Sequence, residues 1–102
     1  MNNPTQKQLA YLKTKIEFYF DKHAIDTEFR RDEFPIGSGQ IARLSWYIDN
    51  MEVHLSVRIY DDETYTITRS TPENVSETGR QQTPDDMQQI VVNVANWNNW
   101  NA

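Results

Sequence analysis

Ser45 and His54 are the residues whose types most resemble catalytic groups. Two predicted strands, about 41–48 and 51–60, place them opposite each other on one face of a hairpin. A serine nucleophile also needs an orienting acid and a preorganised oxyanion hole, and a flat open sheet supplies neither. We therefore expect no catalysis from this pair, a solvated sheet face around it, and a protein that is not an enzyme.

Metal binding has equally little support in the sequence. The two histidines, His23 and His54, fall on different predicted elements, and Glu52 with His54 would provide only two ligands on one face. The acidic turn Asp61-Asp62-Glu63 lacks the alternating ligand spacing and the glycine of a calcium loop. We expect neither a metal nor a cofactor.

The hairpin face that carries these residues is more promising as a binding surface. Arginine and tyrosine are enriched among the residues that dominate protein–protein affinity. Alternation places several of them on the face turned away from the apolar residues. The predicted partner-binding residues are Arg43, Tyr47, His54, Arg58 and Tyr60. The expected partner is a protein, and a homodimer through this face or through an edge strand is an alternative.

The first hairpin positions these residues. A two-residue turn at Asp49-Asn50 keeps every apolar residue on one face, because both residue types tolerate the positive φ angles of tight turns. It also places Tyr47 opposite Glu52. The predicted apolar pairs are Ile48 with Met51, Trp46 with Val53, Leu44 with Leu55, and Ala42 with Val57.

A second hairpin follows at residues 61–63. A three-residue loop pairs Ile59 with Tyr65 and keeps the apolar faces aligned, whereas a loop of two or four residues would not. We predict a strand at about 64–70 and an edge strand from Ile25 to Arg30. Residues 71–82 are polar and rich in turn formers, so they predict a mobile connection.

Two amphipathic helices are expected at the ends of the chain. Thr5 and Gln8 form a capping-box pattern before an apolar stripe, which predicts a helix at about 5–22. Tyr11 and Phe18 lie beside this stripe and are expected to widen the buried face, with an exposed aromatic contact site as the alternative. Thr83-Pro84-Asp85-Asp86 predicts a second helix start with Thr83 as the N-cap. Trp97 and Trp100 are expected to close the core.

The predicted fold is a single α+β domain over residues 1–102, with about 71–82 as a mobile loop. The order is helix, strand, hairpin, strand, helix, with an antiparallel sheet of three to four strands and both helices packed on one face. Apolar residues make up 37% of the chain and charged residues 25%, which is typical of a globular protein.

Charge and targeting signals narrow the classes of function. The net charge of −5 argues against direct nucleic-acid binding, which depends on neutralising phosphates with Lys and Arg. The sequence has no cysteine, no apolar run long enough to span a membrane, and no signal-peptide pattern at Met1. We expect a cytoplasmic protein with no membrane contact.

Three hypotheses for function follow. The first is a non-enzymatic protein-binding module of unknown partner. The second is an acidic inhibitor or nucleic-acid mimic, of the type that phages and mobile elements use against nucleic-acid enzymes. Its phosphate-like charges would be Asp61, Asp62, Glu63, Glu73, Glu77, Asp85 and Asp86. The third is a small enzyme whose site carries no recognisable motif.

Overall fold

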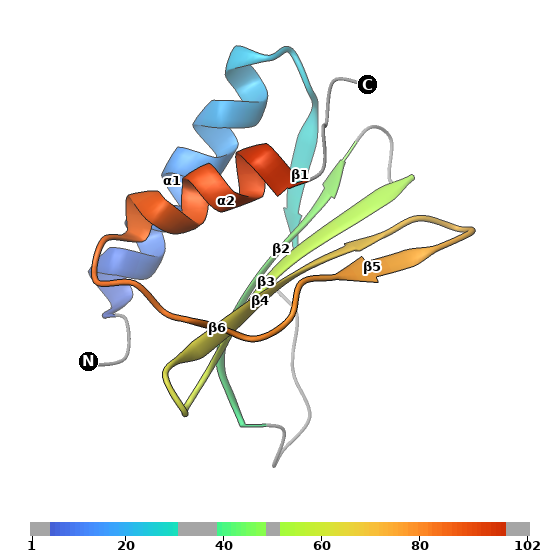
Figure 1. The fold of residues 1–102 in the computed structure, drawn as a ribbon. Coiled ribbons are helices and arrows are strands. Elements are labelled where there is room, and N and C mark those ends of the chain that lie inside the picture. The colour runs from blue at the N-terminus through green and yellow to red at the C-terminus, as the bar shows by residue number, and fades with distance from the viewer. Residues whose placement is uncertain (1–4, 31–38, 49–51, 98–102) are drawn as a thin grey trace. The chain divides into compact units, whose positions relative to one another are not determined.

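The computed structural model describes residues 5–30, 39–48 and 52–97. It shows an α+β protein with two helices and an antiparallel sheet, so this level of the fold prediction is confirmed (Figure 1). No helix within the described ranges is long and apolar enough to cross a membrane. The elements are α1 (Gln6–Lys22), β1 (Thr27–Arg30), β2 (Gln40–Ile48), β3 (Val53–Tyr60), β4 (Thr64–Ser70), β5 (Val75–Glu77), β6 (Gln81–Gln82) and α2 (Met87–Trp97).

The chain divides into two compact units. The helix unit comprises Met1–Ile25 and Pro84–Ala102, and the sheet unit comprises Asp26–Thr83. The organisation of both units as one domain stays a prediction.

The predicted capping box begins α1. The Thr5 hydroxyl accepts from the Gln8 N–H at 3.1 Å, and the Gln8 side chain accepts from the Thr5 N–H at 2.8 Å. The helix ends with Ala24 at a φ of 57°, where its N–H donates to the Asp21 carbonyl and the Ile25 N–H donates to the Phe20 carbonyl. This paired arrangement satisfies two of the last helical carbonyls, so local hydrogen bonding defines both ends of α1.

The second helix begins later than predicted. Asp86, not Thr83, acts as its N-cap, because the Asp86 carboxylate accepts from the Gln88 N–H at 2.9 Å. The Thr83 N–H instead donates to the Glu63 carbonyl at 2.8 Å, which continues the hydrogen bonding of the sheet unit. The side chains of Trp97 and Trp100 lie outside the described residues, so their predicted role in the core stays a prediction.

The two helices pack against each other within the helix unit. The Tyr11 hydroxyl of α1 donates to the Gln88 side chain of α2 at 3.2 Å. Tyr11 and Phe18 are 41% and 63% exposed, so the prediction that they widen the buried face was wrong. The buried stripe of α1 is narrower and consists of Leu12, Ile16 and Phe20.

The sheet has more strands than predicted. Its order is β1-β2-β3-β4-β5, and β6 also pairs with β4, which gives six strands where the sequence predicted three or four. β1 lies at an edge, as its charged alternation predicted. The two additional strands lie in the segment 71–82, for which we predicted only a mobile connection.

The β2–β3 register differs from the prediction. Ile48 pairs with Val53, Trp46 with Leu55, and Leu44 with Val57, each displaced by two residues from the predicted partner. Four residues rather than two therefore separate the paired strands, and the predicted Asp49-Asn50 turn lies outside the described residues. Because a displacement of two preserves side-chain alternation, each residue stays on the face that the sequence predicted.

The β3–β4 register is confirmed. Ile59 pairs with Tyr65, and Val57 with Ile67, across a three-residue loop. Glu63 closes this loop at a φ of 66°, and its N–H donates to the Tyr60 carbonyl. A left-handed residue in the third position is typical of three-residue hairpin loops.

One face of the sheet is apolar and buried. Phe29 of β1 contacts Trp46 of β2 edge-to-face, with 5.6 Å between ring centroids. The buried residues of this apolar face are Leu44, Trp46, Ile48, Leu55, Val57, Ile59, Tyr65 and Ile67. These side chains form the core of the sheet unit.

Candidate functional site

The opposite side of the sheet, here called the polar face, carries the predicted partner-binding residues. Strand pairing and alternation bring all five onto this one face. The polar face consists of Glu28 and Arg30 of β1, Gln40, Arg43, Ser45 and Tyr47 of β2, His54, Ser56, Arg58 and Tyr60 of β3, Thr64, Thr66, Thr68 and Ser70 of β4, Val75 and Glu77 of β5, and Gln82 of β6.

The neighbours within this face differ from the prediction. Ser45 lies opposite Ser56, not His54, and their hydroxyl oxygens are 3.1 Å apart. Tyr47 lies opposite His54, not Glu52, and the two rings have centroids 4.9 Å apart. The two-residue register displacement causes both changes, and it separates the serine and histidine that resembled a catalytic pair.

The centre of the polar face is less hydrated than expected. Ser45, Ser56, Thr66 and Thr68 are between 0% and 4% exposed, although we predicted a solvated surface. Their side chains are short, whereas the surrounding register positions hold Arg, Tyr and His. The centre of this face is therefore a buried cluster of hydroxyl groups.

Two arginines at the margins stack on tyrosines and have carboxylate partners. The Arg30 guanidinium lies 5.2 Å from the Tyr47 ring centroid and pairs with Glu28 at 3.0 Å. Arg80 lies 3.8 Å from the Tyr60 ring centroid and pairs with Asp62 at 3.0 Å. Tyr60 is only 7% exposed, so an approaching partner would meet Arg80 before the Tyr60 ring.

Arg43 and Arg58 form the other arginine pair of the polar face. They lie directly opposite each other on β2 and β3. In the described part of the chain, no carboxylate lies within ion-pair distance of either residue. The Arg58 Nε is buried without a hydrogen-bond partner. Like charges opposite each other destabilise a sheet, so this pair weakens the fold.

At the tip of the second hairpin, the surroundings of Asp62 change its proton affinity. A hydrogen bond from the Thr64 hydroxyl, together with the nearby Arg80 guanidinium, holds the pKa of Asp62 below its ordinary value. Asp62 also accepts from the Thr64 N–H at 3.2 Å. This carboxylate therefore stays ionised to a lower pH than usual, and it holds Arg80 near Tyr60.

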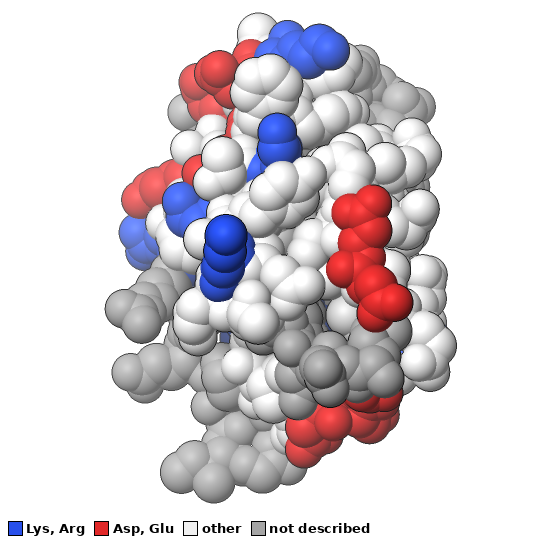
Figure 2. Space-filling model, turned by 90° about the vertical axis from the view of Figure 1, so that its left-hand side faces the viewer, with Lys and Arg blue, Asp and Glu red and all other residues white. Residues whose placement is uncertain are grey.

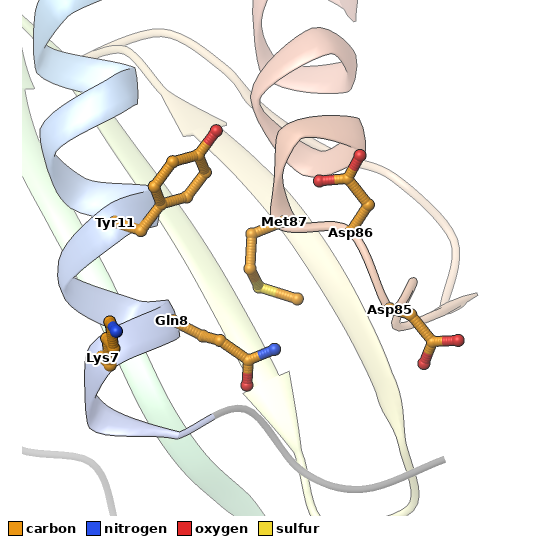
Figure 3. A pocket seen from close by; sticks show the side chains of 6 residues that line it. All are labelled: Lys7, Gln8, Tyr11, Asp85, Asp86 and Met87. Atoms are coloured by element: carbon orange, nitrogen blue, oxygen red, sulfur yellow. The ribbon is translucent and has the colours of Figure 1, made fainter.

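A hollow of about 280 Å³ lies within the helix unit (Figure 3). Its polar groups largely have partners in that unit, because Gln8 belongs to the capping box, Tyr11 bonds to Gln88, and Asp86 caps α2. Its lining residues are Lys7, Gln8, Tyr11, Asp85, Asp86 and Met87. These contacts give Gln8, Tyr11 and Asp86 structural roles.

A second hollow of about 310 Å³ lies in the same unit, and its lining includes Tyr19, Val91 and Ala95. Phe18 and Val92 are exposed at its edge, and Lys15 and Lys22 flank it. On the side of the molecule drawn in Figure 2, Lys and Arg side chains are scattered among uncharged residues, and some lie beside Asp or Glu. No group of three His, Asp or Glu side chains in residues 5–30, 39–48 and 52–97 could hold a metal ion.

Several residues of the polar face escaped prediction. Gln40 reaches this face because of a bulge at Ile41, and its side chain accepts from the Arg43 Nε at 3.2 Å. Arg80 lies in the segment that was predicted to lack strands. Thr66 and Thr68 follow directly from the confirmed β4 register, so the alternation could have identified them.

Comparison with known proteins assigns the chain to no family. No protein-family model matches the chain, and neither the curated proteins nor the solved structures include a significant match.

Proposed function

We propose that this chain is a non-enzymatic protein-binding module that contacts its partner through the polar face of the sheet. The contact residues are Arg43, Tyr47, His54 and Arg58, with Arg80 covering Tyr60. One observation carries the proposal: two cross-strand pairs, Arg43 with Arg58 and Tyr47 with His54, lie on the same face of the sheet with only the Ser45–Ser56 pair between them.

The composition of this face supports the proposal. Arginine and tyrosine anchor many interfaces because they combine large contact areas with directional hydrogen bonds. The Tyr47 and His54 rings contact each other at a tilt, and the buried Ser45 and Ser56 lie between this ring pair and the arginine pair, so packing limits side-chain freedom. An ordered surface loses less conformational entropy when a partner binds.

The proposal also requires a face that a partner can reach. The sequence predicts that both helices pack on one face of the sheet, which stays a prediction. Packing against the apolar face would leave the polar face open, since each helix carries an apolar stripe.

Site-specific photo-crosslinking tests the proposal. A photoreactive phenylalanine analogue replaces Tyr47 in one protein and the exposed Tyr11 of α1 in a matched control, and each is irradiated in a lysate of the source cells. We expect the analogue at position 47, but not at position 11, to capture one specific protein. Capture should fall at least tenfold in a variant that also carries Arg58→Ala.

The same experiment separates the alternatives. Equal capture from positions 47 and 11, or capture unaffected by Arg58→Ala, would contradict binding through the polar face. Loss of the partner in an Asp61→Asn, Asp62→Asn variant, together with a steep decrease as salt rises, would support the acidic-mimic hypothesis instead, because exposed charges are screened by salt.

A further inference from the structure

The arrangement of Arg43 and Arg58 indicates what kind of group the polar face binds. Arg43 is oriented from its own strand, because the Gln40 side chain accepts its Nε hydrogen at 3.2 Å. Without the bulge at Ile41, alternation would place Gln40 on the apolar face. The bulge therefore supports Arg43 and leaves the terminal nitrogens of its guanidinium available for another acceptor.

Two buried polar atoms in and next to the Arg43–Arg58 pair have no hydrogen-bond partner among the described residues. They are the Arg58 Nε and the Thr68 hydroxyl oxygen, and Thr68 is only 4% exposed. Arg58 lies opposite Thr66 on β4, and Thr68 is the next residue along the same face. Buried polar groups in native proteins nearly always have partners, so adjacent exceptions require an explanation.

We propose that Arg43 and Arg58 form an anion-binding site for a carboxylate side chain, a Glu or Asp of the partner protein. This inference rests on the proposed function and names the chemistry that the partner presents. A carboxylate held by the terminal nitrogens of both side chains would offset the repulsion between the two guanidinium groups. Arginine suits this role because its planar fork matches the two carboxylate oxygens.

A single carboxylate fits the site better than a nucleic acid does. Nucleic-acid binding needs many cations along a phosphate backbone, and the chain carries a net charge of −5. On the polar face, Arg30 is paired with Glu28, and the neighbouring Arg80 is paired with Asp62. Among the described residues of this face, Arg43 and Arg58 are left without a carboxylate partner. Two arginines suffice to bind one carboxylate, either by one fork or by a bridge between both.

An NMR titration with a model ligand tests this site. The probe is capped tetraglutamate, the matched control is capped tetraglutamine, and the signals followed are the Nε–Hε resonances of Arg43 and Arg58 in the full chain. We expect tetraglutamate to shift both resonances in a saturable manner, and tetraglutamine to leave them unchanged. Arg58→Gln and Arg43→Gln should each weaken binding about tenfold or more.

Further variants separate geometry from charge. Arg58→Lys keeps the charge but removes the fork, so its affinity should lie between those of the wild type and Arg58→Gln. Lys22→Gln removes the same charge from the helix unit and should leave the affinity within twofold of the wild type. Tetraglutamate binding that is unchanged in Arg58→Gln would overturn the proposal, as would tighter binding of a thymidine tetranucleotide than of tetraglutamate at matched salt.

The failure of this site can be distinguished from the failure of the proposed function. If Tyr47 crosslinks capture a partner but tetraglutamate does not bind, the carboxylate site is wrong and the binding module stands. If tetraglutamate binds through Arg43 and Arg58 but the crosslinks capture nothing, the site stands and the partner-binding proposal is wrong. Amide spectra of each variant establish that it is folded.

Discussion

The two faces of the sheet follow different physical rules. On the apolar face, the uncharged side chains of Trp46, Leu55 and Val57 are fully buried. On the polar face, Arg43 and Arg58 oppose each other, and the Thr68 hydroxyl is buried without a partner. Both features destabilise the fold. The contrast indicates that the apolar face maintains stability, whereas the polar face carries the arginine pair from which the anion-binding site is proposed.

The largest effect is expected from Trp46 on the apolar face. Trp46→Ala removes a fully buried indole and its edge-to-face contact with Phe29, so it should lower the free energy of unfolding by about 3–5 kcal/mol. Chemical denaturation measures this change. A loss below about 1 kcal/mol would show that Trp46 is not a centre of the core, and the contrast between the faces would weaken.

A reciprocal pair of isosteric substitutions compares the faces directly. Val57→Thr introduces a hydroxyl into the apolar face and should destabilise the protein by about 1–3 kcal/mol, because Val57 is fully buried. Thr68→Val removes the unpartnered hydroxyl from the polar face and should be neutral or stabilising by up to about 1 kcal/mol. Denaturant midpoints of both variants provide the measurement, and equal losses would contradict the comparison.

Arg58 should show opposite effects on stability and binding. Arg58→Met removes a like charge opposite Arg43 and a buried Nε without a partner, so stability should stay the same or rise by about 1 kcal/mol. Binding of tetraglutamate should weaken at the same time. Thermal unfolding and the NMR titration measure the two effects, and a marked loss of stability would identify Arg58 as a structural residue instead.

The smallest effect concerns Asp62 at the hairpin tip. Its pKa is lowered in the folded chain, so its stabilising contribution is fully present above the pKa of the unfolded state and is lost as pH falls through the folded pKa. Wild type and Asp62→Asn should therefore converge in stability at acidic pH, below about 4. Carbon NMR of the carboxyl group should place its titration below that of an unperturbed aspartate, and an ordinary midpoint would contradict the role of Thr64.

Local signals explain which predictions were confirmed. The capping box of Thr5 and Gln8 involves residues three apart, and the β3–β4 loop has only one length that keeps the apolar faces aligned. The β2–β3 loop offers no such test, because two residues and four residues preserve the same alternation. The sequence therefore predicted the face of each partner-binding residue correctly and the neighbours of Ser45 and His54 wrongly.

Long-range hydrogen bonds explain the other errors. Thr83 has the chemistry of an N-cap, but its N–H donates to Glu63 twenty residues earlier, and Asp86 caps the helix instead. The strands within 71–82 carry little apolar signal, since Val75 is 64% exposed. Their backbone groups pair with β4, and such pairing does not depend on side-chain periodicity.

By itself, the sequence determined the α+β class, the first helix and its cap, the second hairpin, and the division of the strands into an apolar and a polar face. These features depend on residues close together in the chain and on a period of two. The tertiary structure alone decided that Arg43 lies opposite Arg58, that Tyr47 lies against His54, and that Arg80 covers Tyr60. Each of these contacts depends on strand register or on backbone pairing between distant segments, and local patterns leave both undetermined.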